Sequence, residues 1–186
     1  LAEALNAARR PVLYAGGGVI AAGAAEELRA LARQGRIPVT TTLMGLGAFP
    51  EDDPLSLRML GMHGSVAANR AVAGCDLLVA VGARFDDRIT GKVSEFAPGA
   101  KIAHLDIDRS AIGKSVRIDY PVVGDVRQAL RALLPLVRTV PRDEWLQEVA
   151  AWQREHPFAY DMTSGTLPAQ YVIEQIDQVS EGKAII

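Results

Sequence analysis

The sequence predicts a doubly wound α/β fold, with a mainly parallel sheet and helices on both of its faces. Short apolar segments alternate along the chain with helical patterns, which is typical of parallel strands joined by helices. The first such segment, PVLYA, is followed by three glycines and a helical pattern, and this order begins a βαβ unit. In a fold of this kind, ligands bind at the carboxyl ends of the strands.

The elements can be placed in chain order. The amino-terminal residues LAEALNAARR form an amphipathic helical pattern that Pro11 interrupts. Strand-like apolar segments follow at residues 11–15, 37–42, 76–82, 101–108 and 120–124. Helical patterns cover residues 24–34, 65–75 and 125–137, and Asp125 is a suitable N-cap for the last of them. The alternation of the two kinds of segment gives the parallel sheet of the predicted fold.

The carboxyl-terminal part of the sequence changes in character. After Pro141 comes a polar helical pattern, RDEWLQEVAAWQREH, and later LPAQYVIEQIDQV leads into GKAII, which is typical of the start of a buried strand. We expect a central domain over residues 1–140, a linker over residues 141–166 and the start of a second, truncated domain over residues 167–186. Because the chain starts within a helix and stops within a strand, we expect it to be a piece of a longer protein.

Composition limits the classes of function. The 186 residues carry a formal net charge of -2 without a lysine or arginine cluster, so neither nucleic acid nor a membrane surface is an expected partner. The single cysteine, Cys75, excludes an internal disulfide and a cysteine metal cluster, and suits a small buried residue. The sequence has neither a long apolar span nor a signal-peptide pattern. We therefore expect a cytoplasmic protein.

Glycine-rich segments follow two of the predicted strands. Residues 16–18, all glycine, allow a tight turn and close approach to an anionic ligand, but they are equally typical of a plain connection. Residues 43–47 and 60–64 carry leucine and methionine between glycines, and could line an apolar slot for a flat ring or simply pack as loops. No second histidine or cysteine lies at metal-ligand spacing from His63, so we expect no metal there.

Charged residues crowd the loop after the most apolar strand. Arg84 could bind phosphate through its fork of donors, while Asp86 or Asp87 holds Arg84 or Arg88 in place. The alternative is a cluster of surface salt bridges, which would contribute little to stability. The position of the four charges at the mouth of the sheet favours a binding site.

Acidic residues end the next two strands. Asp106 and Asp108 could accept hydrogen bonds from ribose hydroxyls, and Asp125 with Val126 could meet the edge of a purine. The sequence contains no nucleophile elbow, no P-loop and no acid and base pair beside a nucleophile. It therefore predicts a binder of an extended nucleotide, not a complete catalyst.

Long segments of the chain resemble one known family. The chain is similar to the central domain of the catalytic (large) subunit of acetolactate synthase, or acetohydroxyacid synthase, in PVLYAGGGV, IPVTTTLMGLGAFPEDDPLSLRMLGMHG, DLLVAVGARFDDRITGKVSEFAP, AKIAHLDIDRSAIGK and VVGDV. The resemblance extends to about Leu134, and LPAQYVIEQIDQVSEGKAII resembles the entry to that family's pyrophosphate-binding domain. The implied fold is the Rossmann-like central domain of thiamine diphosphate enzymes.

The resemblance implies an activity for the parent protein. In that family, a thiamine diphosphate and magnesium-dependent transferase condenses pyruvate with pyruvate or 2-ketobutyrate, losing carbon dioxide, in branched-chain amino acid biosynthesis. The middle domain binds FAD, which does no net redox work. The catalytic glutamate and the motif for magnesium and diphosphate belong to the other domains, so the resemblance implies neither a catalytic residue nor a metal ligand here, and no synthase activity of the chain alone. It also implies a homo-oligomeric parent, and leaves a regulatory small subunit open.

The resemblance assigns residues of this chain to the site. It implies contacts to FAD from Gly17, Thr42, Leu43, Leu60, Gly61, Met62, His63, Gly82, Ala83, Arg84, Phe85 and Asp86. The adenosine end of FAD is assigned to Asp106, Ile107, Asp125 and Val126. Asp87 and Arg88 are implied to lie toward the substrate channel.

Two other interpretations stay open. The central domain of another thiamine diphosphate enzyme, such as pyruvate oxidase or glyoxylate carboligase, would share the fold, although LMGLG, MLGMHG and RFDDRITGK favour acetolactate synthase. A regulatory module that binds NAD or FAD belongs to a different class. That interpretation expects no thiamine diphosphate domain on either side of this chain in the parent.

Overall fold

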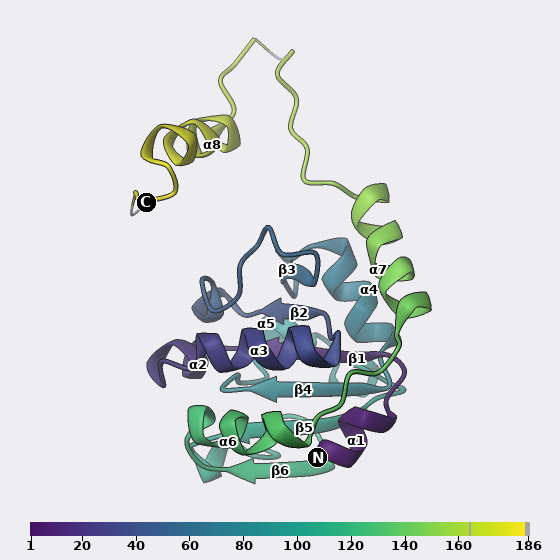
Figure 1. Ribbon diagram of the computed structural model, residues 1–186. Coiled ribbons are helices and arrows are strands. Elements are labelled where there is room, and N and C mark those ends of the chain that lie inside the picture. The colour runs from purple at the N-terminus through teal and green to yellow at the C-terminus, as the bar shows by residue number, and fades with distance from the viewer. Residues whose placement is uncertain (164, 185–186) are drawn as a thin grey trace. The chain divides into compact units, whose positions relative to one another are not determined.

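The computed structural model describes residues 1–163 and 165–184. The chain divides into two compact units, Leu1–His156 and Pro157–Ile186. The first unit is built on a six-stranded sheet, and the second contains helix α8 (Ala169–Ser180) (Figure 1). The predicted sheet therefore belongs to the first unit.

The sheet is parallel throughout and has the order β3-β2-β1-β4-β5-β6. Its strands are β1 (Pro11–Ala15), β2 (Val39–Thr41), β3 (Ser56–Met59), β4 (Leu77–Val81), β5 (Lys101–Asp106) and β6 (Tyr120–Val123). The chain moves outward from β1 to β3, returns to the centre at β4, and then moves outward on the other side. This order is that of a doubly wound sheet with its switch point between β1 and β4, and the predicted fold class is confirmed.

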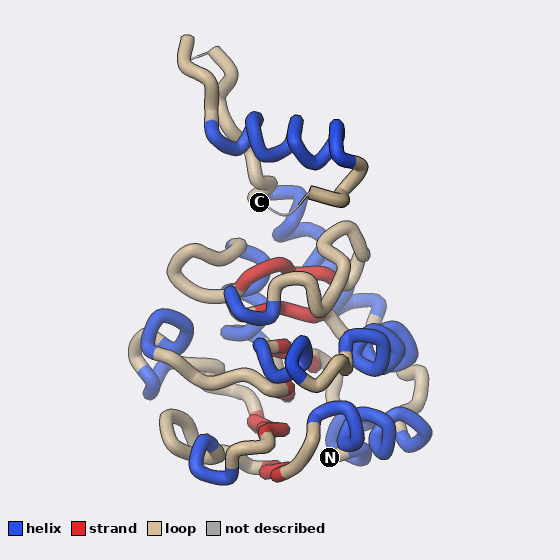
Figure 2. Tube along the Cα trace, turned by 90° about the vertical axis from the view of Figure 1, so that its left-hand side faces the viewer, coloured by secondary structure: helices blue, strands red, loops and turns tan. Residues whose placement is uncertain are grey.

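Helices cover both faces of the sheet (Figures 1 and 2). They are α1 (Ala2–Ala7), α2 (Gly17–Ala21), α3 (Ala25–Gly35), α4 (Val66–Gly74), α5 (Asp87–Thr90), α6 (Val126–Leu133) and α7 (Asp143–Glu155). Four short 3-10 helices lie between them, namely η1 (Leu43–Gly45), η2 (Val93–Glu95), η3 (Arg109–Ala111) and η4 (Leu134–Leu136). The side chain of Asp125 accepts a hydrogen bond from the Gln128 amide at 2.9 Å, which confirms it as the N-cap of α6.

Two hydrophobic cores sandwich the sheet. Alternate residues of each strand point to opposite faces, so Leu13 and Val79 enter one core while Val12 and Leu78 enter the other. The first core is completed by buried residues of α1, α3 and α6. The second is completed by α4 and α7, and it also holds Cys75, whose predicted role as a small buried residue is confirmed. All five residues of both β1 and β4 are buried, which makes these two strands the buried centre of the unit.

Strand β3 was not predicted from the sequence. It has only four residues, and its register against β2 shifts between Val39 and Thr40. Arg58 lies in this strand at a φ of 62°, a conformation that non-glycine residues adopt infrequently. A short strand that contains an exposed charge and an irregular register leaves too weak a periodic pattern to be recognised.

Helix α7 packs against the first unit, although its residues fall in the segment expected to be a linker. Trp145 and Val149 are buried in the second core, and Trp145 Nε1 donates a hydrogen bond to the Pro11 carbonyl at 3.2 Å. The contacts divide the chain at residues 156 and 157, whereas domain boundaries at residues 140 and 166 stay a prediction.

The carboxyl-terminal unit bears on two further expectations. The helical pattern at residues 167–179 forms α8, and the strand expected from GKAII includes Ile185 and Ile186, which lie outside the described residues.

Within the described ranges, no helix has both the length and the apolar character that crossing a membrane requires.

Candidate functional site

The predicted site residues follow strands that all end at the same edge of the sheet. Because the sheet is parallel, the segments after β1, β2, β3, β4, β5 and β6 all start at its carboxyl edge. The residues after the first four strands are Gly17, Thr42, Leu43, Leu60, Gly61, Met62, His63, Gly82, Ala83, Arg84, Phe85, Asp86, Asp87 and Arg88. Asp106 ends β5, and Ile107, Asp125 and Val126 follow β5 and β6. The topology thus gathers residues that lie far apart in sequence.

Two glycine loops meet at the switch point. Ala15 at the end of β1 pairs in register with Val81 at the end of β4. Beyond them, the Gly16 amide donates to the Val81 carbonyl at 3.0 Å, and the Gly18 amide donates to the Gly82 carbonyl at 2.9 Å. The two loops are therefore joined through their main chains.

The glycines at this junction are required by the close approach of the two backbones. A Cβ atom on Gly16 would lie 2.3 Å from the Gly82 carbonyl oxygen, and one on Gly82 would lie 2.7 Å from the Gly18 Cα. Gly82 also has a φ of +56°. This glycine-rich segment had two interpretations, a ligand-binding turn and a plain connection. Close packing of the two loops accounts for Gly16 and Gly18. At Gly17 the space is less restricted, since a Cβ there would lie 3.1 Å from Met44 Cβ.

Phe85 anchors the charged loop after β4. Its side chain is 6% exposed, and its ring contacts those of Tyr14, Phe96 and His104 at centroid distances of 6.0, 5.9 and 5.2 Å. The hydroxyl of Tyr14 donates to the Arg84 carbonyl at 3.3 Å. Because the Phe85 side chain is held in this aromatic cluster, a ligand at the edge of the sheet would meet the main chain of this residue.

The charges on either side of Phe85 point outward. Arg84 Nη2 lies 3.5 Å from Asp86 Oδ2, with the two side chains 76% and 57% exposed. An ion pair so exposed contributes little to stability, so the guanidinium can exchange this partner for an anionic ligand. Asp87 begins the short helix α5, and its Oδ1 accepts a hydrogen bond from the Arg88 amide at 2.9 Å. A buried aromatic anchor with exposed charges explains why this loop mixes the two kinds of residue.

Apolar side chains are exposed at the β2 and β3 side of the same edge. Leu43, Met44 and Met62 are 67%, 75% and 64% exposed. In contrast, Leu60 is buried in the second core, and the hydroxyl of Thr42 is buried with no hydrogen-bond partner among the described residues. Exposed apolar side chains beside a buried, unsatisfied hydroxyl suit a flat, partly polar ring.

The acidic side chains at the β5 and β6 side differ in how they are engaged. Asp106 accepts from the Asp108 amide at 2.9 Å, and the Gly124 amide donates to the Asp106 carbonyl at 2.9 Å, which links the loops after β5 and β6. The Asp125 carboxylate caps α6, and Val126 is buried. Ile107 is 72% exposed. Ile107 therefore offers an exposed side chain to a ligand, whereas Asp106, with its side chain 14% exposed, Asp125 and Val126 are engaged within the fold.

Asp108 serves the turn that follows β5. Its side chain accepts from the amide and the hydroxyl of Ser110, at 2.8 and 2.7 Å, and so caps η3. These hydrogen bonds lower the pKa of Asp108 below its ordinary value. A local structural role accounts for this carboxylate.

His104 is a buried polar residue that sequence reasoning did not select. Its side chain lies beneath the loop after β4, and among the described residues neither ring nitrogen has a hydrogen-bond partner. The nearest carboxylate contact joins His104 Nε2 and Asp106 Oδ2 at 3.6 Å. Burial lowers the pKa of His104 below its ordinary value of 6.5, and Asp106 opposes this shift. The sequence signal for this residue is a histidine placed within the apolar segment KIAHLDID, where a buried side chain is expected.

This environment predicts a pH dependence of stability that His104 controls. The folded state disfavours protonated His104. As the pH falls below about 6.5, His104 is therefore protonated at a higher pH in the unfolded chain than in the folded chain, which favours unfolding. We expect the free energy of unfolding to decrease from pH 7 to pH 5.5, and a His104→Leu variant to lose less over the same range. Urea unfolding at both pH values measures this, with His63→Gln at an exposed position as the control. Equal pH dependence in the wild type and His104→Leu would contradict the prediction.

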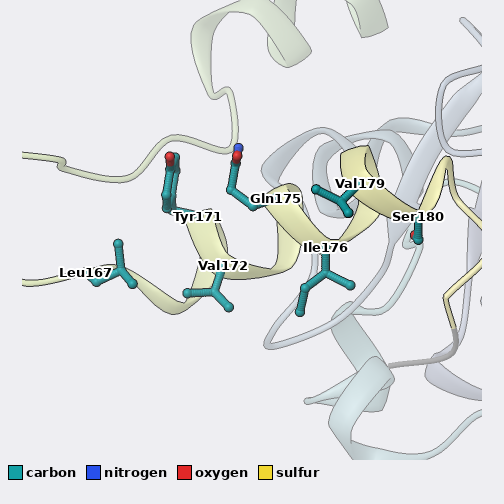
Figure 3. Close-up of a pocket in the computed structure, with 7 residues that line it drawn as sticks. All are labelled: Leu167, Tyr171, Val172, Gln175, Ile176, Val179 and Ser180. Atoms are coloured by element: carbon teal, nitrogen blue, oxygen red, sulfur yellow. The ribbon is translucent and has the colours of Figure 1, made fainter.

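Two cavities lie away from these residues. One, of about 830 Å³, is lined by residues before β1 and around the start of α7, including Arg9, Arg10, Arg142 and Trp145. It is thus at the amino end of β1. The other, of about 420 Å³, lies in the second unit along α8, where Val172 and Ile176 point to the same side of the helix (Figure 3). None of the predicted site residues lines either cavity.

The fold and the carboxyl edge define a doubly wound α/β domain of the class that commonly binds nucleotides. Residues 1–133 match the model of the family described as thiamine pyrophosphate enzyme, central domain, and the chain belongs to this family.

Individual relatives are similar over most of the chain. It is 49% identical over 184 residues to acetolactate synthase 1, chloroplastic, of Zea mays, covering 96% of this chain and 28% of that protein. It is 53% identical over 151 residues to the probable acetolactate synthase large subunit of Methanocaldococcus jannaschii, covering 80% and 26%. It is 44% identical over 191 residues to acetolactate synthase of Mycobacterium bovis, covering 99% and 31%. The predicted resemblance is confirmed, and the chain spans less than a third of the length of these relatives.

Proposed function

We propose that the chain is the FAD-binding central domain of an acetolactate synthase large subunit. The observation that carries this proposal is the identity of 44 to 53% to acetolactate synthases over 80 to 99% of the chain. The parent would be a thiamine diphosphate-dependent transferase that condenses pyruvate with pyruvate or 2-ketobutyrate. Because the relatives bear acetolactate synthase names and the family model is that of a thiamine enzyme, this proposal is favoured over pyruvate oxidase, glyoxylate carboligase or a free regulatory module.

FAD is the cofactor proposed for this domain, and the residues at the carboxyl edge fit it. Arg84 offers an exposed guanidinium to the diphosphate, and the exposed side chains of Leu43 and Met62 suit the apolar flavin ring. Asp106 can accept hydrogen bonds from a ribose, as acidic residues do in related dinucleotide folds. Gly17 and Gly61 pack closely against Met44 and against Arg88 and Ile89, and are proposed to contribute main-chain groups to the site. Asp87 and Arg88 are proposed to face the substrate channel.

Thiamine diphosphate and Mg²⁺ are proposed for the parent, through parts outside this chain. When bound, thiamine diphosphate supplies carbanion stabilisation for the condensation. The match of this chain to a central domain, and its coverage of about 28% of the Zea mays relative, support assigning those cofactors to other domains. The proposed parent acts on 2-keto acids, is cytoplasmic and forms a homo-oligomer, with or without a regulatory small subunit.

Titration of the purified chain with FAD tests the proposal. We expect saturable binding, followed by flavin fluorescence, and about tenfold weaker binding by Arg84→Ala, because a lost charge-assisted hydrogen bond is worth about 1.5 kcal/mol. Arg117→Ala is a matched control, since Arg117 is also exposed and pairs at 3.8 Å with the acid two residues on, Asp119. Arg117 precedes β6 and so lies away from the carboxyl edge.

Three outcomes would count against the proposal. Equal effects of Arg84→Ala and Arg117→Ala would remove Arg84 from the site. Absence of binding by the full-length parent as well as by the chain would refute the FAD assignment. The same preparations are assayed for acetolactate formation from pyruvate, which we expect from the parent and not from the chain; formation by the chain alone would refute its assignment as an inactive central domain.

A further inference from the structure

The side chain of Asn69, on α4, clamps the main chain of Gly61. Asn69 Oδ1 accepts a hydrogen bond from the Gly61 amide at 3.3 Å, and Asn69 Nδ2 donates to the Gly61 carbonyl at 3.0 Å. The same Nδ2 donates to the Ser65 carbonyl at 3.0 Å. A side-chain amide is the group that matches both the donor and the acceptor of one residue's main chain. Gly61 is thereby held to a helix by both of its main-chain groups.

Gly61 is also where this segment touches the charged loop after β4. A Cβ on Gly61 would lie 2.8 Å from the Arg88 carbonyl oxygen and 2.8 Å from Ile89 Cδ1. The Met62 amide donates to the Arg88 carbonyl at 3.3 Å. Gly61 has a φ of +103°, which directs the chain into this contact. The segment after β3 and the segment that begins α5 therefore meet at Gly61 and Met62.

Helix α4 is a firm base for this clamp. Its N-cap Ser65 accepts from the Ala68 amide at 2.9 Å and donates to the Leu57 carbonyl at 2.6 Å, which fixes the start of the helix to β3. Ala68 and Val72 bury the inner face of α4 in the second core. Asn69 lies just over one turn beyond the cap, so its position is set by a packed helix rather than by a loop.

We propose that Asn69 is a positioning residue that holds residues 60–63 and residues 84–88 together as one binding surface. The link to cofactor and substrate rests on the proposed function, which assigns the first segment to FAD and the second to FAD and the substrate channel. Without the clamp, residues 60–63 lose their attachment to α4, whereas the loop after β4 keeps its anchor at Phe85. Met62 then no longer keeps a fixed separation from Arg84. Binding of FAD then requires ordering residues 60–63 first.

Amide hydrogen exchange of the chain without FAD tests the clamp directly. In Asn69→Ala, we expect the Gly61 and Met62 amides to exchange about tenfold faster. The Gly61 amide loses its acceptor, and the Met62 amide lies on a segment no longer held opposite the Arg88 carbonyl. Amides of β4 should be unchanged, which separates loosening of the loops from global destabilisation. Asn69→Asp keeps an acceptor for the Gly61 amide but loses both donated hydrogen bonds, so it should not restore the wild-type rate for Met62. Arg70→Ala, at the next exposed position of α4, is the control.

The outcomes separate this inference from the proposed function. Unchanged exchange of the Met62 amide in Asn69→Ala, or equal acceleration in Arg70→Ala, would overturn the positioning role whether or not the chain binds FAD. Faster exchange together with a five- to tenfold loss of FAD affinity would support the whole inference. Faster exchange with unaltered affinity would show that the clamp does not serve FAD binding and would overturn that part. Failure of wild-type FAD binding would bear on the proposed function alone.

Discussion

Gly82→Ala is expected to destabilise the first unit by about 3 kcal/mol or more, from a left-handed backbone cost of about 1 to 2 kcal/mol and a comparable steric cost. The new Cβ would lie 2.7 Å from the Gly18 Cα and 3.0 Å from the Val19 amide nitrogen. Because these neighbours are main-chain atoms, no side-chain rotation relieves the clash. The loops after β1 and β4 would have to separate, which breaks the hydrogen bond between the Gly18 amide and the Gly82 carbonyl.

Gly23→Ala is the matched control for this prediction. Gly23 has a φ of +60°, close to the +56° of Gly82, but a Cβ there meets no atom within 4 Å. It should therefore show the backbone cost alone, about 1 to 2 kcal/mol. Urea unfolding followed by circular dichroism measures both variants. If Gly82→Ala were no more destabilised than Gly23→Ala, the close junction of the two loops would not be needed for stability.

Arg142→Met is expected to destabilise the first unit by about 3 kcal/mol or more, because it leaves buried carbonyls without donors at about 1 to 3 kcal/mol each. Arg142 is 3% exposed and donates to the carbonyls of Leu5 at 2.6 Å, of Ala8 at 3.2 Å and of Gly35. These carbonyls belong to the ends of α1 and α3. Methionine retains much of the apolar stem, so the loss reports the hydrogen bonds and charge rather than volume.

Arg154→Met, at an exposed position of α7, controls for the loss of a charge from the same segment. Unfolding by urea gives the stability of both variants, and limited proteolysis shows whether residues 143–156 become accessible. We expect Arg142→Met alone to release α7 to the protease before the sheet unfolds. An unchanged unfolding midpoint would mean that the hydrogen bonds of Arg142 do not contribute to the stability of the first unit.

The sequence determined the fold class because its evidence is local and periodic. Apolar segments such as residues 76–82 and helical patterns such as residues 125–137 report which side chains are buried, and burial on both faces requires a parallel, covered sheet. Asp125 could be assigned as an N-cap since capping depends on residues only three apart. The family was also predictable, because long segments match in order and the match was confirmed.

The tertiary structure decided what the individual site residues do. Phe85 stands between charged residues, and only its ring contacts with Tyr14 and His104 show that it is an internal anchor. The glycines after β1 were ambiguous until the neighbouring loop from β4 revealed how little space each has.

Dependence on tertiary contacts also explains which elements and roles the sequence did not predict. Strand β3 is short and irregular, and the burial of Arg142, immediately before α7, depends on carbonyls more than 100 residues away in sequence. The clamp of Asn69 on Gly61 likewise follows from the path of a loop. Periodicity records whether a residue is buried but not against which partner. The topology of the chain chooses that partner, and so these roles could be assigned only once the segments were brought together.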